Sequence, residues 1–121
     1  MKQCDLYNSL NANASFTEIQ TYVKEVIELR GFSGQSVQES MLLLFEETGE
    51  LAKAIRKSLS GMSIDETRLY RYDTVESEVA DVLIVLLSIC NNLGINLYEA
   101  FLEKEKSNIN RNWTINKESN V

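Results

Sequence analysis

The residues of this sequence that could do chemistry are acidic side chains in two short segments. One segment reads FEETGEL and holds Glu46, Glu47 and Glu50, and the other reads SEVADVL and holds Glu78 and Asp81. Residues three apart lie on one face of a helix, so each segment projects a pair of carboxylates in one direction. Both stripes continue into apolar residues, which is typical of a helix face that packs against another helix rather than facing water.

Asp81 is the most unusual of these residues because it interrupts the apolar run VADVLIVLL. An ionised carboxylate that is buried without a partner costs several kcal/mol, and no Lys or Arg occurs between Thr74 and Gly94 to supply one. If the two stripes face each other, carboxylates about 4 Å apart repel by roughly 4 kcal/mol at an effective dielectric constant of about 20. A divalent cation would relieve this repulsion, and carboxylate ligands favour Mg²⁺ or Mn²⁺.

Two structural interpretations compete with a metal site. Each acidic motif taken alone is common on a solvated helix face. Alternatively, the carboxylates belong to a salt-bridge network, for which the sequence offers these cations: Lys24, Arg30, Lys104, Lys106 and Arg111. We favour the metal site because Glu78 and Asp81 occur in the most apolar segment of the chain, where exposure to solvent is least expected.

The composition excludes several other kinds of site. The chain of 121 residues has no histidine and two cysteines, which removes histidine-based acid/base catalysis and leaves no disulfide framework. The net charge of −6 disfavours binding to nucleic acid. The longest apolar stretch is far shorter than the ~20 residues that span a bilayer, and we identify no signal peptide. We therefore expect a cytoplasmic protein that binds neither nucleic acid nor membrane.

The elements that must position the carboxylates are predicted to be helices of one all-α domain covering residues 1–121. The sequence has no proline, and four small polar residues are each followed three positions later by Glu, as at helix starts: Ser15, Ser36, Asp73 and Asn96. These signals predict helices at 16–30, 37–59, 74–93 and 97–112, with a short helical turn from Ser63. We expect flexible tails at about 1–13 and 114–121.

The segment 74–93 carries apolar residues around its whole circumference, from Val82 to Cys90. A helix that is apolar all round must be covered all round, and the other helices of a small bundle can hardly do that alone. We therefore expect a second subunit to pack on this central helix.

Taken together, the two acidic motifs resemble the signature of the MazG-like, all-α nucleoside triphosphate pyrophosphohydrolases, in which EExxE on one helix is followed by ExxD on the next. Here the motifs read EETGE from Glu46 and EVAD from Glu78, and the resemblance extends over most of the chain through RGF, GELAKAIRK, DVLIVLLSICNNLGINLYEAF and KSNINR. The resemblance implies a four-to-five-helix bundle that forms a homodimer or a dimer-of-dimers tetramer. It also implies Mg²⁺-dependent cleavage between the α- and β-phosphates of a nucleoside triphosphate, which releases a nucleoside monophosphate and pyrophosphate.

The resemblance also assigns roles to individual residues. The metal ligands would be Glu47, Glu50, Glu78 and Asp81, and Glu46 or Glu47 would orient or deprotonate the attacking water. Substrate contacts would come from an aromatic residue and from cationic and amide side chains: Phe32, Lys53, Lys57, Lys104, Asn110 and Arg111. Several relatives have aromatic residues or histidine in the base pocket, at positions where this chain has Lys57 and Val85, so the sequence leaves the base open.

Two alternatives stay open at this point. The chain could catalyse another reaction of the same superfamily, either as a phosphoribosyl-ATP pyrophosphohydrolase or as a dUTPase-like enzyme. It could also belong to a different class, as a non-catalytic helical interaction module in which Asp81 pairs with a Lys or Arg of its partner. A panel of nucleotide substrates separates the first alternative, and calorimetry of Mg²⁺ binding separates the second.

Overall fold

The computed structural model describes residues 2–59, 61–71 and 73–114, and within these ranges the structure is entirely helical. The elements, in chain order, are α1 (Gln3–Ser9), α2 (Phe16–Leu29), α3 (Val37–Leu59), the 3₁₀ helix η1 (Glu66–Arg71), α4 (Val75–Leu93) and α5 (Leu97–Asn108). The described part of the chain contains no strand, so the all-α prediction is confirmed.

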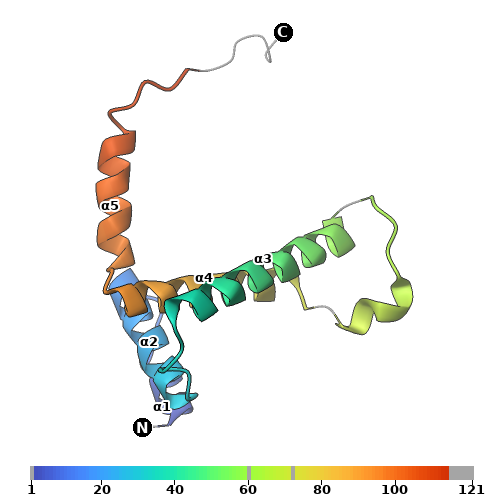
Figure 1. Ribbon diagram of the computed structural model, residues 1–121, viewed down its shortest axis with the longest axis horizontal. Helices are drawn as coiled ribbons and strands as arrows, with labels where there is room; N and C mark the ends of the chain where they lie inside the picture. Colours follow the sequence, from blue (N-terminus) through green and yellow to red (C-terminus); the bar gives the residue numbers. More distant parts are fainter. Residues whose placement is uncertain (1, 60, 72, 115–121) are drawn as a thin grey trace.

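The centre of the molecule is the pair formed by α3 and α4, which lie side by side and run in opposite directions (Figure 1). Helix α2 packs across the end of this pair where α3 begins and α4 ends. The core lies at this crossing and includes Val23 and Val26 of α2 together with Leu87 and Cys90 of α4, all at least 95% buried. Apolar residues at helical spacing on each element produce this packing.

Side chains cap the helix starts much as the sequence predicts. The backbone N–H of Glu18 donates to Ser15 Oγ (3.0 Å) at the start of α2, and the N–H of Glu99 donates to Asn96 Oδ1 (3.0 Å) at the start of α5. At the start of α3 the capping is reciprocal, because Glu39 N–H donates to the Ser36 hydroxyl and Ser36 N–H donates to the Glu39 carboxylate.

The prediction for the start of α4 is wrong by one residue. The N-cap is Thr74 rather than Asp73, and Thr74 Oγ1 accepts from the backbone N–H of Ser77 (3.2 Å). Aspartate and threonine are both good caps, and the pattern of acidic residues downstream did not distinguish them. The shift does not change which face of the helix carries Glu78 and Asp81.

The N-terminal segment differs from the flexible tail expected at about 1–13. Residues Gln3–Ser9 form α1, in which Leu6 is buried against α2. Arg30 Nε at the end of α2 donates to Gln3 Oε1 (2.9 Å) and ties the two helices together. Burial of one leucine gives this short helix a tertiary anchor that the local sequence does not reveal.

Two further boundaries differ from prediction. Helix α5 ends at Asn108 rather than 112, and the short helical turn begins at Glu66 rather than Ser63. Asp65 stabilises the start of η1, because its carboxylate accepts from both the backbone N–H and the hydroxyl of Thr67. The predicted C-terminal tail from 115 onward lies outside the described residues.

A buried glutamine fixes the corner between α4 and α5. Gln20 of α2, which is 7% exposed, donates to Asn91 Oδ1 (3.0 Å) and to the carbonyl of Ile95 (2.6 Å), and its Oε1 accepts from the N–H of Leu97 (3.0 Å). Gly94 ends α4 in the left-handed conformation, with φ at 68°, which glycine adopts without strain. The chain bends by 95° here, so α5 projects from the α3–α4 pair (Figure 1).

Two helices leave apolar side chains uncovered. No residue of α5 is buried, and Tyr98, Phe101 and Leu102 are about half exposed. On α4, Val79 and Leu83 are also exposed, although Leu87, Ile89 and Cys90 are buried. In the described ranges no single helix is long and apolar enough to cross a membrane, and α4 and α5 satisfy that measure only when counted together across their bend.

Candidate metal centre

Three of the predicted carboxylates come together between α3 and α4. Glu47 of α3 and Glu78 and Asp81 of α4 each offer one oxygen, and these three oxygens lie within 4.8 Å of one another. Glu78 and Asp81 share one face of α4 because they are three residues apart, and the packing of α3 on α4 places Glu47 opposite them. We call this group the carboxylate trio.

The trio is partly shielded from water, and its charges repel one another. Glu78 is 6% exposed, while Glu47 and Asp81 are half-buried. Burial raises the pKa of Glu47 above its usual value, and the nearby charges of Asp81 and Glu78 raise it further. Burial likewise raises the pKa of Glu78, with an added contribution from Asp81. Both shifts show that a negative charge is disfavoured here unless a cation compensates it.

The other two acidic residues of the motif lie beside the trio. Glu50, also predicted as a metal ligand, contributes no oxygen to the cluster, but its charge helps to raise the pKa of both Glu47 and Glu78. Its carboxylate instead lies 4.0 Å from Lys53 Nζ, with both side chains more than 40% exposed. Glu46, the predicted catalytic residue, is exposed on α3 next to Glu47, and its charge also raises the Glu47 pKa.

A second question is whether cations of the same chain form a salt-bridge network with the trio. Among the described residues, no ion pair joins the trio to any of the cations that could have formed such a network: Lys24, Arg30, Lys104, Lys106 and Arg111. The charge of Lys53 does act on Glu78, where it opposes the rise in pKa. The trio is therefore left with an excess of negative charge.

The donor set suits a hard divalent cation. All three groups are carboxylates from two rigid helices, and the described residues place no sulfur or histidine nitrogen among them. Mg²⁺ binds in proteins through few carboxylates and keeps positions open for water and phosphate, and Mn²⁺ accepts the same ligands. The residues present thus fit the metal that the family resemblance implies.

The predicted cations of α3 lie on the C-terminal side of the trio. Lys53 is exposed beside Glu50, and Lys57 follows it by four residues and is half-buried. The pKa of Asp65 is lowered, chiefly by hydrogen bonds from Thr67 and to a smaller extent by the charge of Lys57. Lys57 therefore faces the segment that connects α3 to η1, while Lys53 is the cation nearer to the trio.

The cations predicted near the C-terminus are not brought to the trio within one chain. Lys104 lies on α5, which contacts α2 and leaves the α3–α4 pair (Figure 1). Asn110 and Arg111 follow this helix; the Asn110 amide donates to the carbonyl of Lys106 (3.1 Å), and the Arg111 guanidinium lies 4.7 Å from the centre of the Trp113 ring. In this structure the three residues therefore lie away from the trio.

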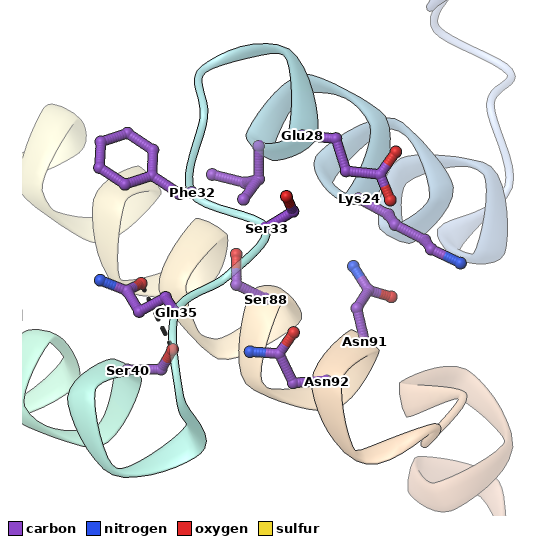
Figure 2. Close-up of a pocket in the computed structure, with 10 residues that line it drawn as sticks. Lys24, Glu28, Phe32, Ser33, Gln35, Ser40, Ser88, Asn91 and Asn92 are labelled. Carbon is purple, nitrogen blue, oxygen red and sulfur yellow. Dashed lines mark hydrogen bonds between the residues drawn. The ribbon is translucent and has the colours of Figure 1, made fainter.

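A cleft near the trio is lined by residues to which the sequence motifs did not point. Phe32, the predicted base contact, is 52% exposed at its rim, and Gln35, Ser40 and Ser88 line its interior (Figure 2). Ser40 is 2% exposed and donates to Gln35 Oε1 over 3.5 Å. A small polar residue on the inner face of α3, seven positions before Glu47, was the available signal for this cleft.

Comparisons with known proteins identify the family of this chain. A sequence model of the "MazG nucleotide pyrophosphohydrolase domain" matches residues 35–113, which include the trio. A crystal structure of the "putative pyrophosphatase YPJD" from Bacillus subtilis is 26% identical, with a TM-score of 0.71, covering 84% of this chain and 100% of that one. No protein with curated function matches. Because the family model covers well over half of the sequence, this chain belongs to the MazG nucleotide pyrophosphohydrolase family.

Proposed function

We propose that this protein is a Mg²⁺-dependent nucleoside triphosphate pyrophosphohydrolase, which cleaves (d)NTPs between the α- and β-phosphates to give the monophosphate and pyrophosphate. The observation that carries the proposal is the carboxylate trio, in which Glu47, Glu78 and Asp81 converge within 4.8 Å in a family of nucleotide pyrophosphohydrolases. Mn²⁺ is the expected substitute for Mg²⁺, since both accept a set of carboxylate oxygens.

The trio would hold the metal, and Glu50 would join it through a change of side-chain rotamer or through water. When bound, Mg²⁺ would neutralise phosphate charge and make a water more acidic. Glu46 is adjacent to the trio yet outside it, so its carboxylate is the better placed of the two catalytic candidates to accept a proton from the attacking water. Glu47 would then act mainly as a ligand.

We further propose that the protein works as a homodimer or a dimer-of-dimers tetramer. The uncovered apolar residues of α5 and α4 support this proposal, because a second copy would remove them from water. Association would also allow α5 of one copy to bring Lys104, Asn110 and Arg111 to the trio of another. The substrate would be a free nucleotide rather than nucleic acid, in keeping with the net charge of −6.

The proposed location is the cytoplasm, with no association with membranes. Cys4 and Cys90 are both free thiols, which agrees with a reducing compartment. Nucleoside triphosphates, the proposed substrates, are also cytoplasmic metabolites.

The test is a measurement of pyrophosphate and orthophosphate released from a panel of canonical and modified triphosphates, with Mg²⁺ or with EDTA. We expect pyrophosphate, released only with the metal present. The panel includes phosphoribosyl-ATP and dUTP, so that preference for either one identifies the alternative reactions of the superfamily. Orthophosphate release, or turnover in EDTA, contradicts the proposal, and absence of both turnover and Mg²⁺ binding favours a non-catalytic module.

A further inference from the structure

The cleft beside the trio has an apolar part and a polar part that share residues. The apolar part, of about 130 Å³, is lined by Ile27, Leu43, Ile84 and Val85, and the polar part, of about 80 Å³, opens toward Asn91 and Asn92. Phe32, Gln35, Ser40 and Ser88 line both parts, which makes them one continuous space between the α2–α3 connection and α4 (Figure 2).

This cleft begins one helical turn from the carboxylate trio. Leu43 precedes Glu47 by four residues on α3, and Val85 follows Asp81 by four residues on α4. At 1.5 Å per residue these separations are each about 6 Å along the helix axes, and both run toward the same end of the antiparallel pair. A nucleotide with its phosphates at the trio therefore has its sugar and base within reach of the cleft.

Gln35 is the residue in this cleft best equipped to read a hydrogen-bonding edge. It is half-buried, and its amide supplies both a donor and an acceptor. The oxygen faces Ser40 at 3.5 Å, a long contact, and the amide nitrogen points away from Ser40 (Figure 2). Ser88 donates its hydroxyl hydrogen to the carbonyl of Ile84 (3.0 Å), which leaves its oxygen able to accept.

The family resemblance implies that the base contacts Phe32, which lines this cleft, and we propose that Gln35 in the same cleft determines which base is accepted. The inference rests on the proposed function, since it assumes that phosphates bind at the trio. Phe32 at the rim covers the face of the base, and the Gln35 amide pairs with the polar edge. Because the adjoining walls are apolar, a base that leaves the half-buried amide unpaired loses a hydrogen bond and binds more weakly.

The test compares Gln35→Met, which keeps the length of the side chain without its hydrogen bonds, with Gln35→Glu, which keeps an acceptor and removes the donor. Gln38→Met is the matched control, because Gln38 is an exposed glutamine on the same stretch of chain. The readout is the ratio of kcat/KM between the best and the poorest base in a panel of triphosphates. We expect this ratio to fall on the order of tenfold in Gln35→Met, and to change in Gln35→Glu according to the base, with Mg²⁺ affinity unchanged.

An unchanged ratio in both Gln35 variants overturns the inference, and so does an equal change in Gln38→Met. If Gln35→Met does not fold, as judged by circular dichroism, Gln35→Glu alone decides.

A second measurement separates this inference from the proposed function. Binding of nucleoside monophosphates is measured by calorimetry in EDTA, without turnover. If the wild-type protein releases no pyrophosphate, the proposed function fails, and the base inference is judged by binding alone. Base-dependent binding that Gln35→Met abolishes supports it, whereas equal binding by wild type and variant overturns it.

Discussion

The α3–α4 pair and helix α5 both carry charged residues assigned to the site, but a single chain arranges only those of the pair. Glu47, Glu78 and Asp81 meet within 4.8 Å because their helices are packed along their length. Lys104 and Arg111, in contrast, lie on or just after a helix with no buried residue, which leaves the pair at a bend of 95°. Within one chain, the acidic residues of the trio are therefore assembled together with Lys53 nearby, while the cations on and after α5 lie away from them.

The two groups of residues are held in place by different contacts. The trio is held in place by the packing of α3 against α4. Its carboxylates repel one another in the folded state, and this repulsion contributes to the raised pKa values of Glu47 and Glu78. The position of α5 depends on the hydrogen bonds of Gln20 at its base and on whatever covers its apolar face. Substitutions in the trio should therefore act mainly on metal-dependent activity, whereas substitutions on or just after α5 should act on KM and on association.

The largest effect is expected from removing charge in the trio. Asp81→Asn or Glu78→Gln should lower Mg²⁺-dependent pyrophosphate release by about a thousandfold or more, because the metal loses a ligand on which the chemistry depends. The fold should survive, since less negative charge remains to be buried. Glu76→Gln, an exposed position on the same helix, is the control. Substantial activity in either trio variant would contradict the site.

The next effect concerns the cations on and after α5. Arg111→Ala and Lys104→Ala should raise KM by about tenfold, with a smaller change in kcat, because each removes a phosphate contact. Lys106→Ala, an exposed lysine on α5, is the control.

Mixing the Arg111→Ala and Asp81→Asn proteins tests whether the cationic residues come from another chain. When the two variants are unfolded and refolded together, part of the activity should show the wild-type KM, because a mixed pair can form one site with an intact trio from one copy and an intact Arg111 from the other. If the activity of the mixture does not exceed the summed activities of the two separate variants, α5 does not complete the site of a neighbouring copy.

A moderate effect is expected on assembly. Phe101 is 55% exposed on α5, and Phe101→Ser should weaken association by roughly 2 kcal/mol if a second copy buries this side chain. Sedimentation velocity over a range of concentrations measures the change, with Glu103→Ser as the exposed control on the same helix. If the wild-type protein has the mass of a monomer at every concentration, the proposal that copies associate is wrong.

The smallest effect is on stability in the absence of metal. Glu47 and Glu78 have a pKa above the usual 4.5, so the folded state binds protons more tightly than the unfolded state does. Their contribution to stability is present below pH 4.5 and is lost as pH rises through the raised folded values. The lowered pKa of Asp65 acts in the opposite sense, but only near and below its usual 3.8.

Thermal unfolding in EDTA should therefore show a Tm lower at neutral than at mildly acidic pH, by a few degrees at most. Added Mg²⁺ should reverse the loss at neutral pH. Glu78→Gln should flatten the pH dependence of the metal-free protein, and a wild-type Tm that rises steadily over this range would contradict the assignment.

Much of the fold and part of the site could be predicted from local patterns. The caps at Ser15, Ser36 and Asn96 place three helix starts correctly, because capping depends on residues three apart. The pairing of Glu78 with Asp81 follows from helical spacing in the same way. Their burial was expected from the apolar residues around them, and the structure confirms it fully for Glu78 and in part for Asp81.

Other features depend on contacts that no local pattern encodes. Glu50 has the spacing of a trio member, yet its oxygens lie outside the cluster and near Lys53. A flexible tail was expected at the N-terminus, but the structure has helix α1 there, because Leu6 is buried against α2. Both differences arise from how neighbouring elements pack, which sequence spacing alone does not specify.

Local sequence patterns were enough to predict that the chain is helical, where most helices begin, and that acidic residues share faces with apolar ones, because all three depend on residues within a turn or two. The packing of distant segments was needed to show which carboxylates meet, which side chains line the neighbouring cleft, and that α5 leaves the bundle. Gln20, for example, acts on Asn91 and Leu97, which are 71 and 77 residues away. Such contacts form when distant segments pack, and only then does a pattern of charges become a site.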